Sequence, residues 1–243
     1  MANGHAWHLP DDIISSEHLT LEGKKISTSQ NWAIWVKDIV DTYNSDSIRF
    51  YLLSNGPEKK DSDFSWKDFI ESNNSELVGA YGNLINRTLA FIHKYQNGIV
   101  PTGILSEEVR VEIEKTYTIM GEKIENGNFR EAIDEVFSLV RFGNKYYDFN
   151  QPWKTRMTNA IECNDTLFNC VQIISNLAVL LSPFLPFSSN KILNWLNLSC
   201  IWEQQYVETG YKLPPITILF DRIDKSRIEN ELTKLESMSH KTQ

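Results

Sequence analysis

The sequence predicts a mainly α-helical protein: an α-helical bundle preceded by a small segment of mixed α/β structure. Apolar residues recur at helical spacing through most of the chain after residue 68. The earlier part instead combines short extended pieces, turn residues and short helices. With 41% hydrophobic and 12% aromatic residues, the 243-residue chain can bury a sizeable core. We therefore expect two parts, residues 1–68 and residues 69–243.

Short elements are predicted in the first part. In order, they are an extended piece at residues 19–21, a turn at residues 22–23, an extended piece at residues 25–26, a helix starting at residues 29–31, and a helix from residues 46–47 that stops at residues 55–57. Asp61 and Asp63 are interpreted as turn and helix-start residues, in preference to an acid/base pair.

The second part is predicted to be helical almost throughout. The expected elements are a long helix through residues 77–95, helices at residues 107–125, 129–147, 165–181 and about 191–198, an extended stretch at residues 210–223, and a polar helix from residue 226. They predict a bundle of about five helices. The apolar run at residues 167–187 contains Asn169, Gln172 and Asn176 as one polar stripe, so we interpret it as a core helix and expect no membrane span.

Charge and composition narrow the possible functions. A net charge of -8 argues against coating nucleic acid through bulk electrostatics, so any such role must be local. Residues 106–135 carry nine acidic and four basic side chains, whereas residues 141–156 carry four basic and one acidic. The basic stretch could meet a phosphate backbone. The alternative is that the two stretches are simply differently solvated helix faces.

Cysteine and histidine positions do not indicate a metal site. Cys163, Cys170 and Cys200 show no C-x-x-C spacing, so neither a zinc knuckle nor a disulfide framework is expected, and a reducing, cytoplasmic setting fits. His5 and His8 lie close together, but no third ligand follows. No charged region followed by an apolar one opens the chain, so no signal peptide is expected.

A short motif follows the predicted turn, made of Lys25, Ile26, Ser27, Thr28 and Ser29. Such runs are common in solvated loops, so the match is weak until its context is considered. That context consists of residues 30–35, 46–52, 61–66, 79–88, 152–153, 181–186 and 219–224. In this order and spacing the chain resembles methionyl-tRNA synthetase, a class I aminoacyl-tRNA synthetase, especially the archaeal-type branch, over nearly its whole length.

The resemblance implies a role for the motif as the lysine-serine signature loop, usually written KMSKS. In that family the loop closes on ATP and stabilises its triphosphate, which requires preorganised cations and hydroxyl or amide donors. Lys25 matches the first lysine of the motif. Thr28 stands where the motif has its second lysine, as also occurs in the archaeal-type branch, so a neutral donor replaces one cation. For Lys24, a plain solvated loop stays the alternative.

The resemblance also implies an anticodon site at Asn83, Arg87 and Trp153, which match the residues that read a CAU anticodon. Asn83 and Arg87 are four residues apart and therefore project from one helix face. Asn and Arg can bond a base edge, and a tryptophan can stack on an unstacked base. The alternatives are a structural polar pair and a core tryptophan. Gly79 and Gly82 suggest that a neighbour or ligand approaches this helix closely.

Other expected parts of a class I synthetase are missing from the sequence, namely a HIGH-type histidine motif, a methionine pocket and the zinc-binding cysteines of the family's inserted domain. We therefore expect a C-terminal region, either an expressed fragment or a separate open reading frame, that cannot form methionyl-adenylate alone. Its expected partners are methionine-accepting tRNA and an N-terminal catalytic domain in cis or in trans. ATP and magnesium would serve the complete enzyme, with none bound to this chain alone.

Two other functions stay open at this point. The chain could be a stand-alone synthetase-related tRNA- or RNA-binding module without catalytic activity. It could also derive from another class I synthetase of the same subgroup, which would share the bundle but not the set of Asn83, Arg87 and Trp153.

Overall fold

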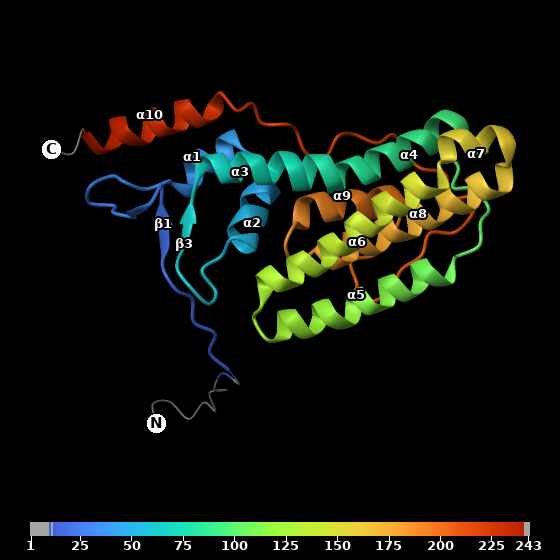
Figure 1. Cartoon of the computed structure of the whole chain (residues 1–243), viewed down its shortest axis with the longest axis horizontal. Helices are drawn as coiled ribbons and strands as arrows, with labels where there is room; N and C mark the ends of the chain where they lie inside the picture. The colour runs from blue at the N-terminus through green and yellow to red at the C-terminus, as the bar shows by residue number, and fades with distance from the viewer. Residues whose placement is uncertain (1–9, 11, 241–243) are drawn as a thin grey trace, which may run out of the picture.

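A computed structural model of the protein describes residue 10 and residues 12–240. Most of these residues are helical, and a small three-stranded sheet lies near the start of the chain (Figure 1). The predicted mainly α fold is confirmed. The sheet and the first helices lie at one end of an elongated molecule, and the longer helices form the bundle at the other end.

The sheet has the order β2-β1-β3, built from β1 (Leu19–Leu21), β2 (Lys24–Lys25) and β3 (Ser62–Phe64). Strands β1 and β2 are antiparallel, and their predicted turn is confirmed: Glu22 and Gly23 have φ angles of 49° and 71°, as the tightest hairpin turns require. Strand β3 was not predicted and runs parallel to β1.

The assignment of Asp61 and Asp63 to a turn and a helix start was wrong. Asp63 lies inside β3, and its Oδ1 accepts hydrogen bonds from the Thr20 hydroxyl and, at 2.8 Å, from the Gly23 amide. Asp61 Oδ1 accepts from the amide of His18. Both carboxylates therefore fasten the first hairpin to β3.

Helices α1 (Val36–Thr42) and α2 (Ser45–Ser54) follow the hairpin. The predicted start of α1 at residues 29–31 was wrong, because residues 27–32 form a tight loop closed by backbone pairing of Ser27 with Trp32. Asn31 has a φ angle of 52° there, which no residue inside a right-handed helix adopts. The start of α2 is confirmed, and the Asn44 side chain caps it by accepting from the Asp46 amide.

One long helical rod follows, made of α3 (Trp66–Ser72), the π-helix η1 (Asn73–Gly82) and α4 (Asn83–Tyr95). The predicted helix through residues 77–95 is present, but its first part is wound as a π-helix. A Cβ atom at Gly82 would lie 2.8 Å from the Leu77 carbonyl oxygen, and one at Gly79 would lie 3.1 Å from that of Asn74. The glycines therefore make room for the carbonyl five residues earlier in their own π-helix, which is a close approach of a neighbour of the kind that the sequence suggested.

The bundle is completed by α5 (Glu107–Glu125), α6 (Phe129–Asn150), α7 (Pro152–Thr158), α8 (Ala160–Leu181) and α9 (Pro186–Leu196). Helix α5 has the predicted bounds, and α6, α8 and α9 begin or end within a few residues of them. Helix α7 was not predicted. It is separated from α6 by Gln151, whose φ angle of 44° ends the first helix, while Pro152 opens the second.

The polar stripe of α8 is buried, as the sequence predicts for a core helix. Its side-chain amides form hydrogen bonds with the backbone of an irregular segment across the bundle. Gln172 donates to the Val207 carbonyl and accepts from the Val207 amide, and Asn176 makes the same pair of bonds with the backbone of Gln205. Buried polar side chains are thus satisfied by a segment without secondary structure of its own. No helix in the described ranges is long and apolar enough to cross a membrane.

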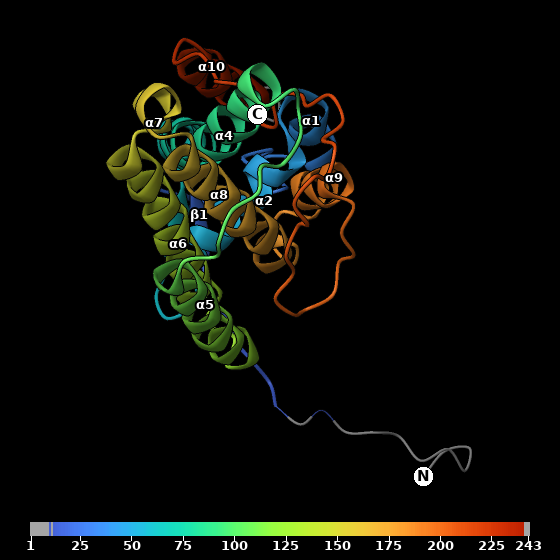
Figure 2. The ribbon, with the colours of Figure 1, turned by 90° about the vertical axis from the view of Figure 1, so that its right-hand side faces the viewer.

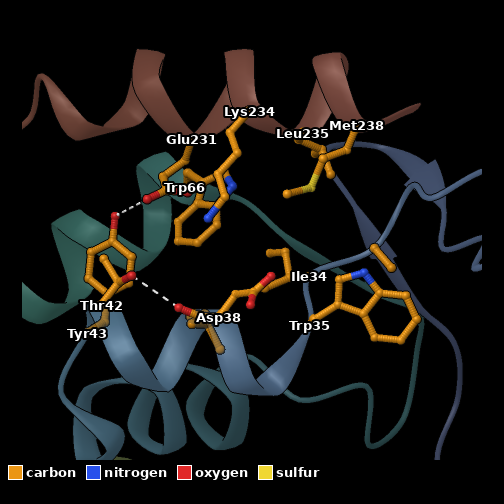
Figure 3. A pocket seen from close by; sticks show the side chains of 12 residues that line it. Ile34, Trp35, Asp38, Thr42, Tyr43, Trp66, Glu231, Lys234, Leu235 and Met238 are labelled. Atoms are coloured by element: carbon orange, nitrogen blue, oxygen red, sulfur yellow. Dashed lines mark hydrogen bonds between the residues drawn. The ribbon is translucent and has the colours of Figure 1, made fainter. Parts of the chain in front are cut away.

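The last helix, α10 (Arg227–His240), returns to the start of the chain and lies along α3 and α1 (Figure 1). Its Leu235 is buried in a second hydrophobic cluster, which also contains Leu21, Tyr43 and Trp66 and is separate from the bundle core. Figure 3 shows the small pocket where α10 faces α1, with the Tyr43 hydroxyl donating to Glu231 Oε1 at 2.8 Å.

Candidate functional site

The signature motif lies on the exposed edge of the first hairpin and on the loop that follows. Lys25 belongs to β2, Ser27 pairs with Trp32, and Thr28 and Ser29 form the tip of the loop. Lys25, Ile26, Thr28 and Ser29 are all exposed. Among the described residues no carboxylate forms an ion pair with Lys25, so its ammonium group is available to an anion.

The base of this loop is held from two sides. The Trp32 indole donates to the Leu21 carbonyl at 3.0 Å, and Lys24 Nζ lies 4.3 Å from the centre of the same ring. On the other side, the Asn31 side chain donates to the carbonyl of Met238 in α10 at 3.3 Å. Lys24 is therefore held against an aromatic face, whereas Lys25 is exposed and makes no ion pair or ring contact with the described residues.

Asn83 and Arg87 project from one face of α4 toward α6, as their spacing predicts. Asn83 Nδ2 lies 3.4 Å from the Asn144 side-chain oxygen, and Arg87 Nη2 donates to the Asn144 backbone carbonyl at 2.7 Å. Arg87 Nη1 donates to Asp148 at 2.8 Å, and its side chain is 21% exposed. Both residues therefore make structural contacts, and each also keeps an exposed edge.

Arg87 and Trp153 meet on a shared aromatic ring, that of Tyr147. The Arg87 guanidinium carbon lies 4.1 Å from the centre of the Tyr147 ring. The Trp153 ring stacks on Tyr147 with 5.8 Å between centroids and 29° between planes. Burial raises the pKa of Tyr147 to about 12, so the phenol is neutral at physiological pH.

Trp153 is not a core residue, because 43% of it is exposed on the short helix α7. Its inner side is supported by Tyr147, and its remaining surface faces solvent. A flat, supported and partly exposed indole is the kind of surface on which an unstacked base lies. The three predicted residues Asn83, Arg87 and Trp153 thus come together around α6. We refer to these three, with Asn144 and Tyr147, as the α4–α6–α7 face.

Asn144 and Tyr147 were not predicted as members of this face. Both appeared in the sequence only as positions in the helical repeat of α6. A polar side chain inside an otherwise apolar repeat, followed by an aromatic three residues later, is the signal that could have identified them. The signature loop does not approach the face: the first hairpin and α7 lie at opposite ends of the molecule (Figure 1).

No group of three or more His, Cys, Asp or Glu side chains that could hold a metal ion occurs within residue 10 and residues 12–240. His5 and His8, whose spacing raised the question of a metal, lie outside the described residues. Cys163 and Cys170 are buried free thiols, and Cys200 is exposed. Burial raises the pKa of Cys170 to about 12, so this thiol stays protonated.

Comparison with known families places the first part of the chain among class I synthetases. Residues 1–89 match the family model described as "tRNA synthetases class I (M)". Residues 101–236 match the model described as "Anticodon binding domain of methionyl tRNA ligase". This second match covers more than half of the chain, and the chain belongs to that family. A different synthetase of the same subgroup is therefore not supported.

Similar proteins agree with this placement. The chain is 52% identical over 228 residues to methionine–tRNA ligase 1 of Alkaliphilus oremlandii and 50% identical to a methionine–tRNA ligase of Bacillus anthracis. Each alignment covers 93% of this chain and 42% of the relative, so the chain spans less than half the length of these proteins. Both relatives are bacterial, and they give no support to the archaeal-type branch.

The fold also resembles solved structures. A Mycobacterium tuberculosis methionyl-tRNA synthetase in complex with methionyl-adenylate superposes with a TM-score of 0.77 at 24% identity. The superposition covers 88% of this chain and 45% of that one. At this identity the likeness supports the fold alone.

Proposed function

We propose that this chain binds methionine-accepting tRNA through the α4–α6–α7 face and reads the CAU anticodon there. The observation that carries the proposal is the convergence of Asn83, Arg87 and Trp153 on Tyr147 and Asn144. Each of the three keeps an exposed edge while its inner side is fixed by α6. A preorganised site loses less conformational entropy on binding than a mobile one.

The division of labour along the chain is part of the same proposal. We assign tRNA recognition to residues 69–243 and the stem-contact or connecting role to residues 1–68. The continuous rod from α3 to α4 would link the two parts mechanically. The cytoplasm is the compartment in which we expect this function. The archaeal-type branch stays a prediction from the order and spacing of the motifs and from Thr28.

We further propose that Lys25, with the hydroxyl groups of Thr28 and Ser29, is this chain's share of an ATP site. Their exposure and the absence of an ion pair to Lys25 among the described residues fit a site for the triphosphate. ATP with magnesium would supply the energy for attaching methionine to tRNA in the longer enzyme. In this chain, Lys25 would neutralise phosphate charge, and the hydroxyl groups would donate to phosphate oxygens.

A stand-alone RNA-binding module is the second candidate. This candidate is favoured because the α4–α6–α7 face is built entirely within this chain. The signature loop at residues 25–29, by contrast, is not a complete catalytic site by itself. Adding the catalytic region of a related ligase in trans would separate the two candidates. Recovered aminoacylation favours the enzyme part, and tRNA binding without recovery favours the module.

The anticodon proposal is tested by titrating the chain with tRNA bearing CAU and with the same tRNA changed at the first anticodon base. Trp153→Ala should weaken binding of the CAU tRNA by about 1–3 kcal/mol, the usual contribution of one base–aromatic stack. It should also reduce the preference for CAU, because the stacked base would no longer be positioned against Asn83 and Arg87.

Trp202→Ala is a matched control. Trp202 is 44% exposed and contacts Tyr117 edge-on, with 5.7 Å between ring centroids and 72° between planes, so it resembles Trp153 in exposure and in having an aromatic neighbour but lies outside the α4–α6–α7 face. Its substitution should leave tRNA affinity unchanged. If both variants bind both tRNAs as the unaltered chain does, the anticodon assignment is wrong.

A further inference from the structure

A second group of aromatic and cationic side chains lies beside the α4–α6–α7 face. It consists of Tyr95, the last residue of α4, with Lys94 and Arg156 over its ring. The Arg156 guanidinium carbon is 4.1 Å and the Lys94 ammonium nitrogen 5.0 Å from the ring centre. All three side chains are exposed, and Arg156 comes from α7, which both views place beside the end of α4 (Figures 1 and 2).

The positive charge of this group is not neutralised by neighbours. Several exposed cations elsewhere pair with carboxylates, as Arg110 does with Glu107 and Glu114. Within the described part of the chain, neither Lys94 nor Arg156 forms such a pair. Lys94, first through a hydrogen bond and then through its charge, and Arg156 through its charge also lower the pKa of the Tyr95 phenol.

The contact with Tyr95 prepares Arg156 for a particular ligand. The guanidinium carbon lies over the ring, and within the described part of the chain its N–H groups donate to no protein acceptor, so these donors are free. Those donors form a planar fork that matches two oxygens of a phosphate group. Because the ring restricts the arginine to one arrangement, less side-chain entropy is lost when an anion binds.

We propose that Tyr95, Lys94 and Arg156 form a clamp for a phosphate group of an RNA backbone, next to the base that lies on Trp153. The inference rests on the proposed function. Arg156 follows Trp153 by three residues, so the two project from neighbouring positions nearly one turn apart, a rise of about 4.5 Å along α7. One nucleotide can therefore place its base on Trp153 and its phosphate at Arg156. The clamp contributes affinity, and the α4–α6–α7 face contributes selectivity.

The test is a titration of the whole chain with the CAU tRNA and its anticodon variant at several salt concentrations. Arg156→Gln should weaken binding of both tRNAs by the same factor, about three- to tenfold, and leave the ratio of their affinities unchanged. The slope of log affinity against log salt should become less steep by about 0.7 for each single-strand phosphate that the protein no longer neutralises. Lys94→Gln should act in the same direction.

Lys191→Gln is the matched control, because Lys191 Nζ lies 5.7 Å from the Trp195 ring centre in a similar cation–aromatic pair. It removes the same charge from α9, which lies on the other side of the molecule from α7 (Figure 2). Tyr95→Leu keeps every charge but removes the ring that holds Arg156, so it should weaken binding, whereas Tyr95→Phe should not.

Three results decide the matter. If Arg156→Gln and Lys191→Gln give the same affinities and the same salt slopes, the clamp is wrong. If Arg156→Gln changes the ratio between the two tRNAs, Arg156 contacts a base, and the phosphate assignment is wrong. If the unaltered chain binds both tRNAs equally, the anticodon proposal fails, and a shallower salt slope for Arg156→Gln alone would still support the clamp.

Discussion

The signature loop and the α4–α6–α7 face differ in how their side chains are held. In the loop, the backbone is fixed by the pairing of Ser27 with Trp32, while the side chain of Lys25 extends into solvent. On the face, Arg87 is fixed by two hydrogen bonds and by the ring of Tyr147. One region presents an exposed cation without a protein partner among the described residues, and the other presents an assembled surface.

This difference separates two kinds of contribution to function. An exposed lysine without a protein partner can neutralise the charge of a ligand, but it needs other groups to complete the site around that ligand. A surface whose side chains are already fixed can recognise its ligand without them. We therefore expect substitutions on the face to change stability as well as binding, whereas substitutions in the loop should leave stability unchanged.

The largest effect is expected from Arg87→Ala. It removes the donors to Asp148 and to the Asn144 carbonyl, so the free energy of unfolding should fall by about 2–3 kcal/mol, mostly through the partly buried bond to the carbonyl. Lys25→Ala should change it by less than about 0.5 kcal/mol. Urea unfolding of both variants measures these changes in the free energy of unfolding. Equal changes would mean that the side chains of the face are no more firmly held than Lys25.

Gly82→Ala tests how the face is positioned by the π-helix that precedes Asn83. The added methyl group would meet the Leu77 carbonyl at 2.8 Å, so we expect a net loss of about 1–2 kcal/mol after the helix propensity of alanine is counted. Gly121 lies in α5 with no neighbour closer than 4.0 Å, and Gly121→Ala should stabilise the protein. Thermal unfolding compares the two, and a stabilising Gly82→Ala would contradict the crowding argument.

Asn31→Gly tests whether the contact with α10 restrains the loop at residues 27–32. Glycine keeps the backbone at positive φ but removes the side chain that donates to Met238, so amide exchange in residues 27–32 should accelerate by about fivefold, as the loss of about 1 kcal/mol implies. Asn197→Gly is the matched control, since Asn197 has a φ angle of 54° at the end of α9. Unchanged exchange in the loop would mean that α10 does not restrain it.

The smallest effect concerns Glu131, whose pKa is lowered to about 2 by hydrogen bonds from Lys123 and Lys59. Because the folded pKa is below the unfolded one, this group stabilises the fold above about pH 4.5, and its contribution is lost as the pH falls toward 2. Glu131→Gln should therefore make the free energy of unfolding depend less on pH between about pH 2 and pH 4.5. Unfolding midpoints between pH 2 and pH 6 measure it, with Glu114→Gln as an exposed control.

Regular helices were predictable because their apolar repeats are local. The bounds of α5 follow from such a repeat and from the Ser106 cap, whose side chain accepts from the Val109 amide. Helix α7 was missed because its seven residues are too few for a repeat and its start depends on Gln151 at positive φ. Strand β3 was missed because its partner lies more than forty residues earlier.

The candidate site was predicted in part. The resemblance identified Asn83, Arg87 and Trp153, and the spacing of the first two places both on one side of α4. What the sequence could not give is the register of α6 against α4, which brings Asn144 and Tyr147 between these residues. That register depends on packing of side chains about sixty positions apart, for which the sequence carries no local signal.

The return of α10 to the first hydrophobic cluster has a consequence for synthesis of the chain. Tyr43 and its partner Glu231 are 188 residues apart, and Asn31 and Met238 are 207 apart. At about 5–20 residues per second, a ribosome needs roughly 10–40 seconds to make the residues between Tyr43 and Glu231. During that interval Tyr43 and Trp66 lack their contacts with α10, so the second hydrophobic cluster is completed only after the bundle has been made.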